Sequence, residues 1–147
     1  MEIKQYDLEN SLMFFFEREA DIKTDIIYDG YEIPNERPLI TIEPMQNNYE
    51  SISKQREAMQ VIYRFQIGLR AGNPVEKRHK QEEISELLTT RKIPYFNTQR
   101  SVDEPVGYFL CNLTAVVPMP ADEINRKSEN HRVYFDVEIE DIKRRWQ

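Results

Sequence analysis

Three carboxylates alternate along a segment near the end of the 147-residue chain. The stretch VYFDVEIEDIKRR, residues 133–145, puts Asp136, Glu138 and Glu140 on one side of a strand and apolar residues on the other. Side chains two positions apart on a strand are about 6.5–7 Å apart, so neighbouring acids cannot easily hold one metal ion without ligands from another strand. The stripe can therefore be a metal site, an acid/base pair, a solvated surface, or a wall that faces a negatively charged molecule.

An enzyme would need more than this stripe. Lys143 follows Asp141 at the acid-x-Lys spacing of nucleases in which carboxylates hold Mg²⁺ and lysine stabilises charge, but Glu138 and Glu140 lack such a lysine. The four glycines form no phosphate-binding loop, and no GxSxG motif is present. We expect no enzymatic activity, no cofactor and no metal. A small metal-dependent nucleic-acid-processing enzyme that uses the carboxylates of this strand is the alternative.

The spacing of apolar residues predicts the helices and strands that position the stripe. Apolar residues at helical spacing predict a helix over about 3–18, and Asn73 followed by Pro74 predicts the start of a second helix that runs to about Thr90. Alternation predicts strands over about 24–28, 39–43, 60–71 and 131–143. The apolar run GYFLCNLTAVV, residues 107–117, predicts a central strand covered on both faces. The expected fold is one α+β domain, 1–147, of order α-β-β-β-α-β-β, with a mostly antiparallel or mixed sheet flanked by two helices.

Two polar segments are predicted to be long loops, at about 45–58 and 119–130. Loops longer than a compact fold requires are usually functional or disordered, so these two are candidates for contacting partners. The candidate contact residues in the first loop are Gln46, Asn47, Asn48, Tyr49, Lys54 and Arg56.

Charge and cysteine content narrow the class of protein. A net charge of −6 and a pI near 5.1 argue against a general nucleic-acid binder, which needs a concentrated basic surface. The one cysteine, Cys111, lies in an apolar run and is expected to be a buried hydrophobic residue in a reducing cytosol. Arg64 and Arg70 lie on the polar side of the strand over 60–71. If that strand pairs with the last one, these arginines can meet the acidic stripe within a chain or across a subunit boundary.

The order of these segments resembles that of tail terminator proteins, also called tail completion or tail-to-head joining proteins, of long-tailed bacteriophages and prophages. The resemblance covers most of the chain and rests on its layout: IKQYDLENSLMFFFE, PLITIEP, the long polar segment, VIYRFQIGLRA, NPVEKRHKQEEISELL, GYFLCNLTAVVPMP and VYFDVEIEDIKRRW. It includes no catalytic motif.

The resemblance implies a non-enzymatic protein that forms a hexameric ring, caps the tail tube, ends its polymerisation and joins the tail to the head. Its implied partners are the tail tube protein and the head connector or stopper protein, with DNA passing through unbound and no membrane involved. It implies a place in the host cytoplasm during assembly and then in the virion. A neck or head-completion protein is the alternative within the same structural class.

Three roles remain open for the acidic stripe. It can line the channel of the ring, where an acidic wall would repel DNA phosphates. It can simply face water. It can also close the ring by meeting a basic cluster of the next subunit. The basic candidates are Lys77, Arg78, Lys80, Arg144 and Arg145.

Overall fold

The protein has an α+β fold with two helices and a mixed sheet, as the sequence predicts. The computed structural model describes residues 2–52, 58–119 and 131–144. The elements are α1 (Gln5–Glu19), β1 (Lys23–Ile26), β2 (Leu39–Pro44), β3 (Asn48–Ser51), β4 (Ala58–Arg70), α2 (Pro74–Thr90), β5 (Ile93–Tyr95), β6 (Gly107–Phe109), β7 (Asn112–Pro118) and β8 (Arg132–Arg144).

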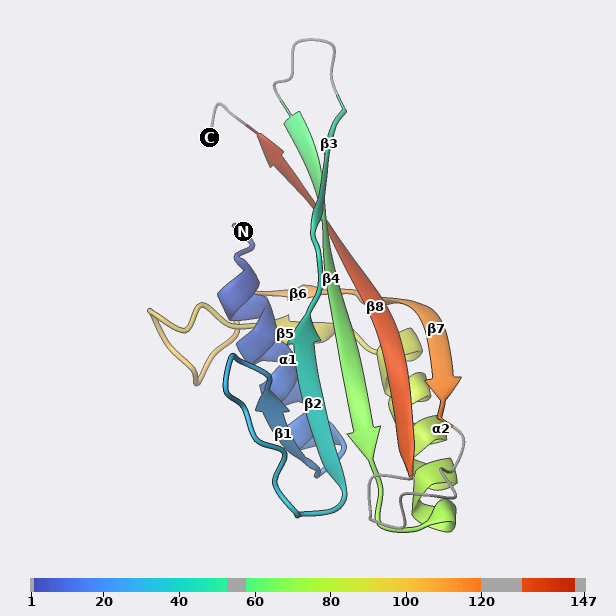
Figure 1. Ribbon diagram of the computed structural model, residues 1–147. Coiled ribbons are helices and arrows are strands. Elements are labelled where there is room, and N and C mark those ends of the chain that lie inside the picture. The colour runs from blue at the N-terminus through green and yellow to red at the C-terminus, as the bar shows by residue number, and fades with distance from the viewer. Residues whose placement is uncertain (1, 53–57, 120–130, 145–147) are drawn as a thin grey trace.

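The main sheet is built around two long antiparallel strands, β4 and β8. Its order is β1-β2-β4-β8-β7; β3 also pairs with β4, and β1 runs parallel to β2 while the other pairs are antiparallel. A separate two-stranded sheet joins β5 and β6. Both helices and the small sheet lie on one side of the main sheet (Figure 1). In the part of the chain that the structure describes, no helix covers the opposite side, here called the outer face.

Local sequence signals explain where the helices and turns lie. The side chain of Asn73 accepts a hydrogen bond of 2.8 Å from the backbone N–H of Glu76, so it caps α2, and Pro74 is the first helical residue. The turn at Asp29–Gly30 is closed by a 2.9 Å bond from Tyr31 N to Tyr28 O, and Gly30 has the positive φ of 84° that such a turn favours. The predicted start of the second helix is confirmed.

One apolar core lies between the helices and the sheet. The alternating residues of β4 and β8 point into it, where they meet the apolar faces of α1 and α2. The largest fully buried side chains include Phe16 of α1, Phe65 of β4, Phe135 of β8 and Tyr95 of β5. Because inward and outward residues alternate on a strand, this burial fixes which side chains of β4 and β8 face outward.

The prediction of one central strand over residues 107–117 is wrong. The run is divided between β6 of the small sheet and β7 of the main sheet, with Leu110 and Cys111 between them. β7 is the edge strand of the main sheet and is largely exposed or half-buried. A continuous apolar run does not reveal the point at which a chain passes from one sheet to another.

Cys111 is buried at this junction, as expected, and burial raises the pKa of its thiol to about 12. Only the thiolate is an effective nucleophile, and each pKa unit reduces its fraction tenfold. In the native protein at pH 8, we therefore expect Cys111 to react with a disulfide reagent such as DTNB about a thousandfold more slowly than an ordinary thiol. The rate should become ordinary in denaturing urea. Rapid labelling of the folded protein would contradict the burial.

The predicted loop at 45–58 contains a strand, which corrects the prediction. β3 pairs with residues 59–62 of β4, and residues 140–144 of β8 pair with residues 58–62 of β4 on its other side. These three strand segments form what we call the arm, and Figure 1 shows it extending beyond the helices. All four residues of β3 are exposed. The second predicted loop lies almost entirely outside the described residues.

Candidate interaction surface

The acidic stripe lies on the outer face of the sheet. In β8 the residues from Val133 to Ile139 that point into the core are buried, and the residues between them point outward. Asp136, Glu138 and Glu140 therefore share the outer face, with Glu140 on the arm and exposed. The side to which the stripe points was predicted correctly from alternation alone.

Arg64 and Glu138 meet across β4 and β8. They are register partners, and Arg64 Nη2 lies 3.2 Å from a carboxylate oxygen of Glu138. Both side chains are partly exposed, so this ion pair contributes roughly 0–1 kcal/mol to stability. Asp136 faces Gln66 and Glu140 faces Ile62 in the same register. The predicted meeting of the two strands' charges is thus confirmed for one pair within the chain.

A shallow depression surrounds this ion pair. It has a volume of about 350 Å³, and polar side chains of β4 and β8 form its floor together with Met45 and Thr114. The depression is open to solvent and displays both signs of charge. Such a surface suits contact with another macromolecule better than enclosure of a small ligand.

Arg70 has a different environment from the one predicted. It lies on the outer face like Arg64, but it is only 6% exposed, and its Nη1 donates a 3.0 Å hydrogen bond to Thr41 Oγ1. Its register partner on β8 is Arg132 rather than an acid. The prediction that Arg70 could meet the acidic stripe within the chain is therefore wrong, because the stripe begins four residues beyond Arg132.

Gly68 makes room for the side chains beside Arg70. A Cβ atom at this position would lie 2.6 Å from Thr41 Oγ1 and 3.3 Å from a ring carbon of Tyr134. Thr41 is buried and holds Arg70, so it cannot rotate freely. We expect Gly68→Ala to lower the free energy of unfolding by about 1–2 kcal/mol, because overpacking exceeds the entropic gain.

The matched control for that substitution is Gly72→Ala. A Cβ at Gly72 would meet Arg37 and Glu76 only at 3.6 Å, which is ordinary contact. Urea unfolding should therefore leave this variant within about 0.5 kcal/mol of wild type. An unchanged unfolding midpoint for Gly68→Ala would show that the surrounding side chains adapt without cost.

The candidate partner-contacting residues lie on the arm and at its base. An open groove of about 490 Å³ runs along it, lined by Gln46, Asn47, Asn48 and Tyr49 together with residues of β3 and β4. Asn47 Nδ2 is 2.6 Å from Gln5 Oε1, which ties the base of the arm to α1. Lys54 and Arg56 lie outside the described residues.

Lys143 is not part of the acidic stripe. It projects from the opposite face of β8, where its amine donates a 2.7 Å hydrogen bond to the carbonyl of Ile3 and lies 5.9 Å from the centre of the Tyr63 ring. Burial raises the pKa of Asp141, and the charge of Lys143 acts in the opposite direction. The structure therefore does not bring Lys143 to Glu138 or Glu140. Within the described ranges, no three His, Cys, Asp or Glu side chains are grouped so as to hold a metal ion.

A buried polar cluster beneath α1 was not predicted. Asp7 is 5% exposed and accepts hydrogen bonds from Thr98 Oγ1 at 2.7 Å, Thr98 N at 3.2 Å and the Tyr95 hydroxyl at 3.4 Å. Desolvation raises the pKa of Tyr95 to about 12. An aspartate one position before the apolar Leu8 was the available signal, but its partners are about 90 residues away and cannot be read from sequence.

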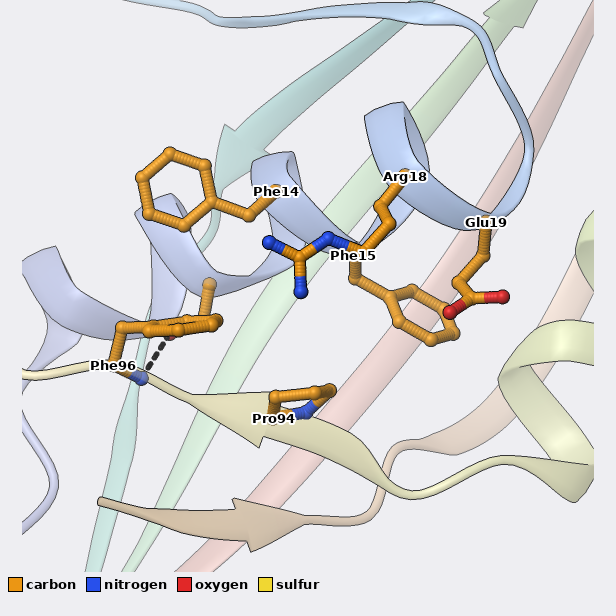
Figure 2. Close-up of a pocket in the computed structure, with 7 residues that line it drawn as sticks. Phe14, Phe15, Arg18, Glu19, Pro94 and Phe96 are labelled. Atoms are coloured by element: carbon orange, nitrogen blue, oxygen red, sulfur yellow. Dashed lines mark hydrogen bonds between the residues drawn. The ribbon is translucent and has the colours of Figure 1, made fainter. Parts of the chain in front are cut away.

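Figure 2 shows a small cleft between α1 and β5. The backbone N–H of Phe96 donates a 3.0 Å hydrogen bond to Ser11 Oγ, and the Arg18 guanidinium lies 6.0 Å from the centre of the Phe96 ring. Phe14 packs edge-on against the same ring. The cleft holds about 30 Å³, the space of a single water, so these contacts join the helix to the small sheet rather than form a ligand site.

No protein-family model matches the chain, and no curated protein is significantly similar to it. In the described part of the chain, no helix has both the length and the apolar character needed to cross a membrane.

Proposed function

We propose that this chain is a tail terminator of a long-tailed bacteriophage or prophage, a structural protein that forms a ring, caps the tail tube and joins the tail to the head. The observation that carries the proposal is that the molecule has both a charged outer face and an arm that extends beyond the helices. Each feature offers a surface to another protein. Together they suit a subunit that contacts several partners at once.

The centre of the outer face, between the arm and the other end of the sheet, is proposed to line the channel of the ring. Asp136 and Glu138 are the acidic residues that lie there. DNA phosphates passing such a wall would be repelled rather than held, because acidic side chains at partly desolvated positions resist screening by salt. The protein would thus let DNA through without binding it.

The arm is the proposed contact with the tail tube protein. Tyr49 is 63% exposed and lies beside amide side chains that can donate and accept hydrogen bonds. Exposed aromatic and amide groups of this kind are common at protein interfaces. The head connector or stopper protein would meet another surface of the ring. Assembly would take place in the host cytoplasm, and the ring would then remain in the virion.

The test is the mass of the purified protein by light scattering, followed by its effect on tube growth. We expect a six-fold species, alone or after addition of tail tube protein, and arrest of tube polymerisation at substoichiometric amounts. A protein that stays monomeric in the presence of tube protein and leaves tube growth unchanged would refute the proposal.

The channel assignment has its own test. Rings of the double variant Asp136→Asn, Glu138→Gln should assemble but retain double-stranded DNA that wild-type rings release, since the repelling charges are gone. The change keeps the size of both partly exposed side chains, and it also releases Arg64 from its ion pair with Glu138. If these rings release DNA as wild type does, the stripe does not act on the passage of DNA.

A further inference from the structure

Two arginines lie side by side at one end of the outer face with no acid between them. Arg70 and Arg132 are register partners on β4 and β8, and Arg70 is 6% exposed. The Nε atoms of both are buried and have no hydrogen-bond partner. Like charges directly opposite each other destabilise a strand pair, and unpaired buried donors add a further cost. An anion bound beside the two guanidinium groups would offset both costs. We call this pair of residues the arginine end.

The described part of the chain does not supply that anion. Asp25 reaches the same region from β1, but its carboxylate accepts a 2.8 Å hydrogen bond from the Tyr31 hydroxyl. Glu36 forms an ion pair with Lys23. No carboxylate of the described residues lies within ion-pair distance of Arg70 or Arg132.

The outer side of the arm has the complementary charge. Glu140 and Glu50 are exposed there, and neither has an ion-pair partner in residues 2–52, 58–119 and 131–144. Glu140 is eight residues from Arg132 along β8, about 26 Å, so it cannot reach the arginine end of its own chain. Among the described residues, the outer face thus carries acids without an ion-pair partner at one end and arginines without an ion-pair partner at the other.

Apolar side chains accompany both charged ends. Ile142, two positions after Glu140 on the same side of β8, is 53% exposed. Near the arginine end, Val117 of β7 is 45% exposed opposite Tyr134. Contacts that combine a small apolar area with a charged pair are typical of specific protein interfaces.

We propose that the arm of one copy of this chain binds the arginine end of a second copy. In this contact the Glu140 carboxylate of the first copy forms ion pairs with Arg132 and Arg70 of the second. The inference rests on the proposed function and names the contact that would close the ring. The two surfaces differ, so the contact is heterologous and repeats from subunit to subunit, as ring closure requires. Guanidinium groups suit such a site because they bind carboxylates with two parallel hydrogen bonds.

The test uses charge reversal and measures mass by sedimentation across a concentration range at low and moderate salt. Arg132→Glu and Glu140→Lys should each weaken self-association at least tenfold. Association should return in part in the double variant and in an equimolar mixture of the two single variants, where positions 132 and 140 of contacting copies again carry opposite charges while Arg70 is unchanged. Glu43→Lys is the control: it makes the same change on the exposed end of β2 and should associate like wild type.

A variant with a neutral side chain distinguishes loss of the contact from misfolding. Arg132→Gln removes a like-charge neighbour of Arg70, so it should unfold no more easily than wild type and yet associate more weakly. The contact would be overturned if the single reversals associate like wild type. It would also be overturned if neither the double variant nor the mixture regains self-association. Wild-type protein that never self-associates would overturn it as well. If the charge-reversed variants still form a ring and that ring still arrests tube growth, the proposed function would hold but this contact would be wrong.

Discussion

Phe135→Ala is expected to lower the free energy of unfolding by about 3–5 kcal/mol, the usual cost of removing a fully buried phenylalanine. The Phe135 side chain is completely buried on β8, the strand that joins β4 to β7. Its register partners are Ile67 on β4 and Val116 on β7, so its loss leaves a cavity between three strands. Such a loss is a large part of the roughly 5–15 kcal/mol that stabilises a typical domain.

Urea unfolding followed by circular dichroism measures this effect. Glu140→Ala is the matched control because it shortens an exposed side chain of the same strand, and its cost should be within about 0.5 kcal/mol. A Phe135→Ala loss below about 1 kcal/mol would mean that the neighbouring strands close the cavity.

Asp7→Ala is expected to cost roughly 1–3 kcal/mol, because it leaves two part-buried donors of Thr98 without their acceptor, whereas the Tyr95 hydroxyl keeps the Glu2 carbonyl. The carboxylate of Asp7 receives the backbone N–H and the hydroxyl of Thr98 and the hydroxyl of Tyr95, and thereby joins α1 to the segment after β5. Removing it loosens the attachment at Thr98, while the hydrogen bond from Phe96 N to Ser11 Oγ still joins the segment to the helix.

The comparison for this prediction is Glu17→Ala on the exposed side of the same helix. Asp7 lies in the first turn, where the helix dipole favours an acid, and Glu17 lies near the other end, so the difference between the variants contains a dipole effect of about 1 kcal/mol besides the buried hydrogen bonds. Amide exchange at Thr98 gives a second readout, which should increase in Asp7→Ala alone. Equal unfolding midpoints for the two variants would show that the cluster contributes little to stability.

The periodicity of apolar residues predicted the helices and strands that bury only one face. The helices and the strands β4 and β8 have a single apolar face, and the Asn73-Pro74 pair marks a helix start by its local chemistry. β3 was missed because all four of its residues are exposed, so no alternation marks it. It is a strand because β4 offers unpaired backbone groups beside it.

The candidate surface was predicted only in part, for a related reason. Alternation places Arg64 and the acidic stripe on one face, but which residues stand opposite one another depends on the register of β4 and β8. That register pairs Arg64 with Glu138 and Arg70 with Arg132. Neither the isolation of the two arginines nor the burial of Arg70 can be deduced without it.

The continuity of β4 gives the arm a mechanical property. β4 runs for 13 residues without interruption and pairs with β3 in the arm and with β2 in the body. The break between β2 and β3 spans only residues 45–47, and the Met45 N–H still bonds to the Arg64 carbonyl at 2.8 Å. With β8 paired to β4 along its whole length, the arm is a rigid lever rather than a hinged flap. A load applied at its tip would be transmitted as torque to the core.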